Sequence, residues 1–441
     1  MFNPVVVALA CLAIGLIFMM LKQGLSRKVD MFSARNMYLV GFIIYQLTSP
    51  AIALKTEDFT FFRVNFPEDT GKKFLMMVVT FLVVFTFSYQ RIKLTPWIAG
   101  KFKFPPRETN DFLLLGLAVF LVVLGMVLRF MPIPNIAAAS VQVSIAFAAI
   151  AAAISGWVWS NRRSNIPVVV VAALVVAASL VIALTGVFGR RPLLAVVMGF
   201  AWGVYHRRVR LMSPAKMMLY IAPFMAAAAI AVAAFTAVRT HDFGKQSDAR
   251  STVSSMRNAN LSGGLKDLLG GQACGSASLW AIENWPDQLE QRFLFSMKYM
   301  GMYFVPRFMW PEKPTPLGND IARLANVKGV NQGGITIPPG VVGYSVAEGG
   351  YWALIIYALF FGQFLRFIDE LVRLNPTNSF IILPAAVATG QAFGLARGCI
   401  AVFTDLIVLG FVSTYFILFV ADRLFGRKLP QLQANPWPQL R

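Results

Sequence analysis

The sequence predicts an all-α polytopic membrane protein with about eleven transmembrane helices and one long loop on the outer face. Its 441 residues are 57% hydrophobic and only 14% charged, a composition too apolar for a soluble globular protein. Apolar runs long enough to cross a bilayer recur along the chain, and short polar segments separate them. A single interval, residues 239–350, is both long and polar, so we expect it to form the outer loop.

The apolar runs divide the chain into helical parts on either side of this loop. The first run has no basic residue before it and no small-residue cleavage site after it, which predicts an uncleaved first helix. The expected helices are 4–21, 38–54, 74–90, 112–130, 136–159, 166–188, 192–205, 217–238, 351–368, 379–396 and 406–421. The expected parts are therefore the helices of 1–238, the loop 239–350, the helices of 351–421 and a tail, 422–441.

Basic residues in the short loops predict the orientation, because Lys and Arg concentrate on the cytoplasmic side of membrane proteins. With the N-terminus outside, Arg27, Lys28, Arg163 and Arg207 fall inside together with most other basic loop residues. Long translocated loops escape this rule, so the basic residues of 239–350 do not oppose it. The net charge of +20 is then explained by anchoring to the lipid bilayer, and no nucleic-acid partner is expected.

The long loop changes in composition along its length. Residues 241–275 are rich in Ser, Gly, Asn and Asp, which is typical of a mobile segment. Residues 283–303 carry apolar side chains three and four positions apart, which predicts an amphipathic helix on the outer surface. The prolines that follow exclude long helices, so we expect an active-site segment of irregular backbone. It would present the charged residues Arg307, Lys313, Asp320, Arg323 and Glu348.

Several classes of site are disfavoured by what the sequence lacks. There is no Gly-rich phosphate loop, no His-Glu-x-x-His motif, and the chain has only two histidines, His206 and His241. This argues against a nucleotide-driven pump, a zinc protease and a haem protein, and we expect neither a metal site nor a cofactor. The cysteines form no recognised framework; Cys11 is expected to be buried in a helix, and pairing of Cys274 with Cys399 is left open.

Arginines stand at the outer ends of otherwise apolar helices. Arg190 and Arg191 precede Pro192, and Arg397 precedes Gly398. Such arginines can simply anchor helix ends at the membrane interface. Here they run against the positive-inside rule, and flanking glycine or proline lets a ligand approach the backbone. Because a guanidinium group binds phosphate through two points, this pattern favours a lipid-linked phosphate or diphosphate as the ligand.

Several stretches of the outer region resemble one known family. They are Val-Pro-Arg-Phe-Met-Trp-Pro-Glu-Lys-Pro at 305–314, Ile-Pro-Pro-Gly-Val-Val-Gly at 337–343, the Gly349-Gly350 pair, and the outer-face arginines Arg190, Arg191 and Arg397. Together they look like the O-antigen polymerase family, the Wzy-type oligosaccharide repeat-unit polymerases. Members of this family often carry, in their outer loops, an arginine that is followed by ten residues and then a glycine. Neither Arg190 nor Arg191 has a glycine at that spacing.

The resemblance implies a function and a place in the cell. By that similarity the chain would be a membrane glycosyltransferase of the bacterial inner membrane that joins O-antigen or exopolysaccharide repeat units on the outer face, with its C-terminus in the cytoplasm. Its donor would be a glycan on undecaprenyl diphosphate and its acceptor a single lipid-linked repeat. The resemblance further implies no nucleotide sugar, no obligatory metal, and a chain-length regulator protein as a partner.

Elementary chemistry assigns roles to the residues of this pattern. Arg191 and Arg397 would stabilise the leaving diphosphate, and Glu348 or His241 would accept the proton of the acceptor hydroxyl. The other predicted substrate-binding residues are cations, or aromatic side chains on which a sugar ring can stack. They are Arg190, Arg307, Lys313, Arg323, Trp310 and Tyr344.

Two other functions stay open at this point. A ligase that moves finished glycan from the same carrier to a lipid A core would share the arginines and the outer loop. Such ligases usually place a histidine in that loop, whereas His241 lies only at its edge. A transporter or flippase of lipid-linked glycan should show polar residues deep in several spans, or broken helices in matching halves. Charge here gathers at one outer surface, so a polymerase is preferred over a ligase, and a ligase over a transporter.

Overall fold

The protein is described here by a computed structural model that covers residues 3–57, 59, 62–102, 110–131, 137–185, 191–239, 273–287, 289–303, 305, 308–325, 337–397 and 400–425. Within these ranges the regular structure is helical and contains no strand. Eight of the helices found there are long and apolar enough to cross a membrane. The architecture is therefore that of an α-helical, multi-pass membrane protein.

Each expected helix range overlaps helices of the structure. The helices before the long loop are α1 (Pro4–Leu25), α2 (Ala34–Phe42), the π-helix η1 (Ile43–Thr48), α3 (Ser49–Thr56), α4 (Pro67–Arg91), α5 (Leu94–Gly100), α6 (Asp111–Phe130), α7 (Ala137–Asn161), α8 (Ile166–Leu184), α9 (Arg191–Arg207), the 3₁₀-helix η2 (Val209–Leu211) and α10 (Pro214–Arg239). From the loop onward they are α13 (Cys274–Asn284), α14 (Phe295–Met302), α15 (Leu317–Leu324), α16 (Gly340–Ala347), α17 (Gly350–Leu374), α18 (Ser379–Leu395) and α19 (Ile400–Phe425). The number of eleven crossings stays a prediction.

Polar residues and prolines fix where the helices begin. The side chain of Asn3 accepts a hydrogen bond from the Val5 N–H at 3.0 Å, and Pro4 occupies the first turn of α1. Ser33 caps α2 and Asn378 caps α18 in the same way. These caps satisfy backbone donors that have no partner inside the helix. These apolar helices therefore begin where a polar side chain can accept a hydrogen bond from a free backbone N–H group.

Glycines bring α9 into backbone contact with α7. A Cβ at Gly199 would overlap the carbonyl of Ala149, and a Cβ at Gly203 would overlap the carbonyl of Ala153. Both pairs step four residues along each helix, so α7 and α9 run parallel. Packing at this distance requires glycine at both positions.

Helix α9 also packs antiparallel to α18. A Cβ built at Gly390 of α18 would lie 2.8 Å from the Cα and Cβ of Ala195 in α9. Further along, the Trp202 indole N–H donates to the Ile382 carbonyl at 2.8 Å. These two contacts define one register, in which residue numbers rise along α9 as they fall along α18. The register decides which residues meet where the two helices end.

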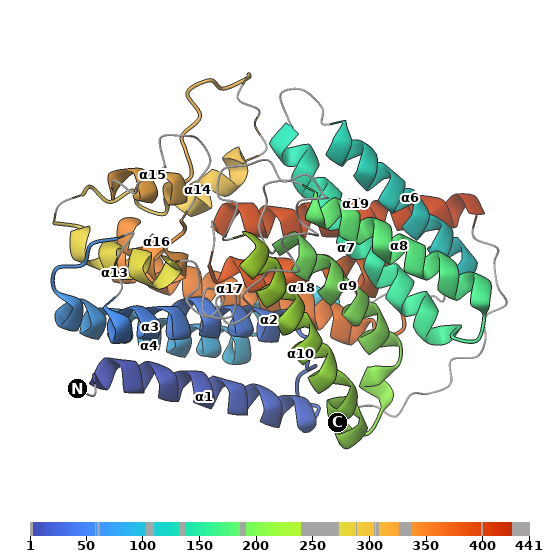
Figure 1. Ribbon diagram of the computed structural model, residues 1–441, viewed down its shortest axis with the longest axis horizontal. Helices are drawn as coiled ribbons and strands as arrows, with labels where there is room; N and C mark the ends of the chain where they lie inside the picture. Colours follow the sequence, from blue (N-terminus) through green and yellow to red (C-terminus); the bar gives the residue numbers. More distant parts are fainter. Residues whose placement is uncertain are drawn as a thin grey trace.

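Helices α13 to α16 gather at one end of the molecule, the end at which the chain begins (Figure 1). The carboxylate of Glu283, at the end of α13, accepts hydrogen bonds from the Asn65 and Phe66 N–H groups, each at 2.9 Å, just before α4. A Cβ at Gly71 of α4 would lie 3.6 Å from the side chain of Val5 in α1. We call this end the loop side. The N-terminus and the loop helices share it, and which face of the membrane it occupies stays a prediction.

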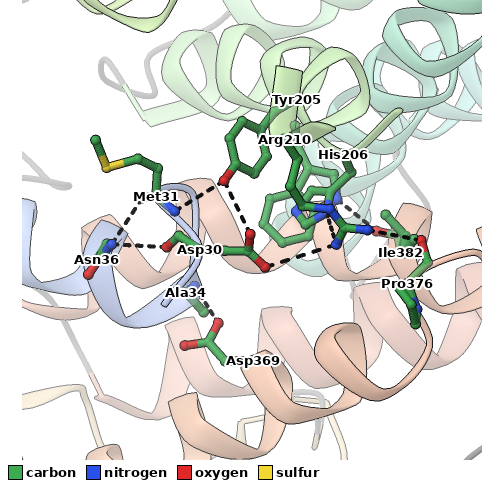
Figure 2. Close-up of polar contacts among 11 residues, drawn as sticks. Asp30, Met31, Ala34, Asn36, Tyr205, His206, Arg210, Asp369, Pro376 and Ile382 are labelled. Carbon is green, nitrogen blue, oxygen red and sulfur yellow. Dashed lines mark hydrogen bonds and ion pairs between the residues drawn. The ribbon is translucent and has the colours of Figure 1, made fainter. Parts of the chain in front are cut away.

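A network of buried and half-buried polar groups joins helices away from the loop side (Figure 2). There Asp30 accepts a hydrogen bond from the Tyr205 hydroxyl at 3.2 Å and pairs with Arg210 at 4.0 Å. The Asp369 carboxylate of α17 accepts the N–H of Ala34 at 2.7 Å and so caps α2 from a distant part of the chain. The network fixes α2, α9 and α17 to one another at their predicted cytoplasmic ends.

Some local expectations differ from the structure. The helix expected over 283–303 is present only as α14, because Pro286 lacks an N–H and separates it from α13. Asp320 and Arg323 lie on the short helix α15 instead of irregular backbone, since the prolines before them can precede a helix without breaking it. Cys11 lies in α1 as expected, but its side chain is exposed on the outside of the bundle.

Candidate functional site

The loop-side ends of α9 and α18 lie side by side. Helix α9 begins at Arg191, and its register with α18 places the backbone of this residue level with Gly394, close before Arg397. Packed helices lie about 8–10 Å apart, so the two backbone positions belong to neighbouring helices at the same end of the molecule. The side chain of Arg191 lies outside the described residues, as do Arg190, His241 and Arg307.

Arg397 is a buried cation without a carboxylate. It is only 9% exposed, and its guanidinium carbon lies 5.7 Å from the centre of the Tyr45 ring. Its Nε is buried and has no hydrogen-bond partner. No carboxylate among the described residues lies within ion-pair distance of it. Because an unpaired buried charge is costly, this arrangement suits an anionic ligand that comes from outside the chain.

Gln46 lies beside Arg397 in the π-helical turn η1. Its side chain is fully buried, with Nε2 3.4 Å from the Ala396 carbonyl oxygen and 3.6 Å from the Cys274 sulfur. The Oε1 of the same side chain is buried and has no partner. π-Helical turns are rare and are frequent at functional sites. Here the turn carries Tyr45, whose ring lies against the Arg397 guanidinium, and Gln46, whose amide contacts the carbonyl of the preceding residue, Ala396.

Two short helices of the loop begin at this point. Helix α16 begins at Gly340, where φ is +72° and a Cβ would overlap the Gln46 amide nitrogen, so the position requires glycine. Helix α13 begins at Cys274, and the N–H of Gly275 donates to the Ser49 hydroxyl at 2.9 Å. Helix N-termini carry a partial positive charge that favours an anion nearby. The C-terminal end of α18 lies at the same place and has the opposite partial charge, so the formal positive charge here is that of Arg397.

Glu348 lies at the far end of α16, about 12 Å from its start at 1.5 Å per residue. It is fully buried and accepts hydrogen bonds from the Ser296 N–H at 2.9 Å, the Ser296 hydroxyl at 2.6 Å and the Tyr357 hydroxyl. Burial raises the pKa of its carboxyl above the ordinary value, and the hydrogen bonds to Ser296 and Tyr357 lower it in part. The carboxyl group thereby joins α14 to α17. Its role as a catalytic base stays a prediction.

Lys313 binds the segment from which it comes. Its buried ammonium donates to the carbonyl oxygens of Tyr303 at 2.7 Å and Val305 at 3.0 Å. The Lys313 N–H donates to the carbonyl of Trp310 at 3.0 Å, and the Trp310 side chain is half-buried. These contacts close the Pro-rich segment on itself, so Lys313 orders the loop. Substrate contacts of Lys313 and Trp310 stay predictions.

Arg323 and Tyr344 lie in two different surroundings. The Arg323 side chain is 66% exposed and pairs at 3.3 Å with the buried Asp320, which also pairs with Arg292 at 2.9 Å. The Thr315 hydroxyl donates to Asp320 at 2.8 Å. Tyr344 is 1% exposed, in the core of α16. A sugar could therefore reach Arg323 directly, whereas Tyr344 would have to be uncovered first.

Sequence reasoning missed two polar residues inside apolar helices. One is Gln46, and the other is Asp405 in α19, which has a buried carboxylate oxygen without a partner. A polar side chain within an apolar run is itself a signal, because such residues are costly in a membrane and usually have a function. The π-helical turn gave no signal, since a short irregularity of this kind leaves the apolar pattern intact.

Comparison with protein-family models, curated proteins and solved structures gives no match for this chain. Among the described residues, no group of three or more His, Cys, Asp and Glu side chains could hold a metal ion. The candidate site therefore rests on the surroundings of Arg397.

Proposed function

We propose that this chain is a membrane glycosyltransferase that polymerises lipid-linked oligosaccharide repeat units of the O-antigen or exopolysaccharide class. The observation that carries the proposal is Arg397, a buried guanidinium that has no carboxylate partner among the described residues and lies near the starts of α13 and α16. A diphosphate is the anion that best fits two nearby arginines, since each guanidinium can bind one phosphate through two hydrogen bonds. The predicted ligand is undecaprenyl diphosphate carrying a glycan.

The proposed reaction is a glycosyl transfer. The hydroxyl oxygen of the acceptor sugar attacks the anomeric carbon of the donor glycan, and the bond from that carbon to the diphosphate oxygen breaks. The hydroxyl proton passes to a base, for which His241 and Glu348 are the predicted candidates. Negative charge grows on the leaving diphosphate, where Arg191 and Arg397 stabilise it in a setting that excludes water. Arg190, Arg307 and Arg323 would bind the phosphates or sugars further out.

The function is tested in a strain that lacks this protein. We expect single repeat units to accumulate on the lipid carrier and long polymer to disappear. The wild-type chain should remove the accumulated repeats and restore the polymer. Arg397→Ala should do neither, at a normal amount of protein in the membrane. Gel analysis of the lipid-linked fraction measures both products.

The same deletion strain distinguishes the alternatives, by the gel for a ligase and by access of an added enzyme for a flippase. A ligase would leave long polymer attached to the carrier when it is deleted, because polymer still forms but is not transferred. A flippase would leave single repeats on the cytoplasmic face, where an enzyme added outside does not reach them. Either result contradicts the polymerase proposal.

A further inference from the structure

Two buried polar atoms without partners among the described residues belong to side chains of the candidate site that are linked through Tyr45 and Ala396. The Nε of Arg397 is a hydrogen-bond donor, and the Oε1 of Gln46 is an acceptor. Gln46 Nε2 lies 3.4 Å from the carbonyl oxygen of Ala396, the residue before Arg397. Each of these groups therefore lacks what the other can supply. Leaving both unsatisfied costs on the order of 1–3 kcal/mol per group.

The orientation of the Gln46 carboxamide is fixed by its surroundings. Its Nε2 lies 3.3 Å from the Tyr45 carbonyl oxygen as well as near that of Ala396. A rotated carboxamide would place its own oxygen against two carbonyl oxygens, which repel it. The acceptor Oε1 is therefore held away from them and stays free for a donor.

We propose that Gln46 is a positioning residue for Arg397, whose Nε–H donates to the Gln46 Oε1 when a diphosphate is bound. This proposal rests on the proposed function. With Nε held in this way, the two terminal nitrogens of the guanidinium form the edge that faces the phosphate. The Tyr45 ring, 5.7 Å from the guanidinium carbon, limits its tilt. Gln46 thus sets the plane of the guanidinium without touching the substrate.

The π-helical turn and Gly340 make room for this arrangement. In a regular α-helix the side chains of Tyr45 and Gln46 would point about 100° apart around the helix axis. The π-helical turn η1 changes this angle where the two residues lie beside the end of α18. Any side chain at Gly340 would occupy the space of the Gln46 amide. Both features serve Gln46, which explains why an apolar segment carries a rare helical turn at this position.

The test combines Gln46→Met with Arg397→Lys. Met keeps the volume of Gln and removes the acceptor, so we expect polymer formation to fall roughly 10²-fold, as for other misplaced catalytic groups. In the Arg397→Lys background, Gln46→Met should cause no further loss, because Lys has no Nε–H to be positioned. Losses that multiply in the double variant, or wild-type polymer in Gln46→Met alone, would overturn the proposal.

A matched control separates positioning from simple structural support. Gln363 of α17 donates to the Ser88 carbonyl and accepts from the Thr95 hydroxyl at 3.1 Å, in another part of the molecule. Gln363→Met should lower the melting temperature, and its effect on polymer should multiply with that of Arg397→Lys. A coupling to Arg397 as strong as that of Gln46 would contradict a specific role for Gln46.

Binding to the purified protein gives a second readout if Gln46→Met does not reach the membrane. Gln46→Glu keeps the size of the side chain and adds a negative charge, which would pair with the Arg397 guanidinium and compete with the diphosphate for it. We therefore expect it to raise at least tenfold the concentration of undecaprenyl diphosphate that is required for the same thermal stabilisation. Unchanged stabilisation would show that the side chain at position 46 does not reach the Arg397 guanidinium, which overturns the role of Gln46. Wild-type polymer in Arg397→Ala would instead refute the proposed function, so the two failures are distinguishable.

Discussion

Arg397 differs from Arg162 and Arg373 in what surrounds it. Arg162 pairs with Asp111 at 2.8 Å and Arg373 with Glu370 at 2.6 Å, whereas Arg397 packs against the Tyr45 ring and has no carboxylate partner in the part of the chain that the structure describes. A paired arginine has its charge balanced within the fold. An unpaired one at 9% exposure retains its charge for a ligand, which is why the residue-level predictions begin here.

Arg397→Lys is predicted to be nearly as damaging as Arg397→Ala. An ammonium keeps the charge but cannot make the planar contact with two phosphate oxygens, so we expect a loss on the order of 10²–10³ in polymer formation. The same is expected of Arg191→Lys. The exposed Arg373, changed to Lys, serves as the control and should keep wild-type activity. Wild-type polymer lengths in both Arg191→Lys and Arg397→Lys would return these residues to a role in anchoring helix ends.

The pKa shift of Glu348 predicts a pH dependence. Its folded pKa is raised above the ordinary 4.5, so its stabilising contribution is complete below that value and is lost as the pH rises through the folded pKa. Glu348→Gln has no such titration. In melting curves at a series of pH values, the wild type should therefore lose stability relative to Glu348→Gln as the pH rises from acidic to neutral. A difference that does not change with pH would show that Glu348 stays in one protonation state.

At the scale of helices, the contact between α9 and α18 sets the distance between the two arginines. Gly390→Ala would place a Cβ 2.8 Å from Ala195 and push the helices apart. We expect a destabilisation of about 1–3 kcal/mol and a larger loss of polymer than of stability. Gly116→Ala is the control, because nothing lies within 4 Å of its Cβ, and it should stabilise α6 by up to about 1 kcal/mol. Equal effects of both variants on polymer would argue against the register.

The long helices could be predicted from the sequence because each corresponds to a long apolar run, which the membrane requires. Helix α13 could not, since its composition of small and polar residues resembles that of the loop before it. The arginines could be singled out because they interrupt an apolar pattern. The placement of Gln46 at the candidate site could not be predicted, because the contact that shows it joins Gln46 to Ala396, 350 residues further along the chain. Such distant contacts leave no trace in local periodicity.

At the scale of the whole molecule, buried polar atoms without a partner among the described residues occur at both ends, and the ends differ in charge. Away from the loop side, Arg210 pairs with Asp30, and the unpartnered atom of the same network is the Nε2 of His206 (Figure 2). On the loop side, the unpartnered atoms include the Nε of Arg397, whose charge no described carboxylate balances. An anionic ligand therefore fits the loop side better than the opposite end.

The unequal distribution of Lys and Arg residues between the two ends leads to a prediction about the membrane. The loop side should face outward, because the short loops at the opposite end carry most of the Lys and Arg residues. In a chain whose three natural cysteines, Cys11, Cys274 and Cys399, are replaced by Ala, Ser254→Cys should react with an impermeant maleimide on intact cells. Arg163→Cys should react only after lysis. The reverse pattern would place the Arg397 site on the cytoplasmic face, whereas the proposed polymerisation takes place on the outer face. It would therefore refute the orientation and the proposed function together.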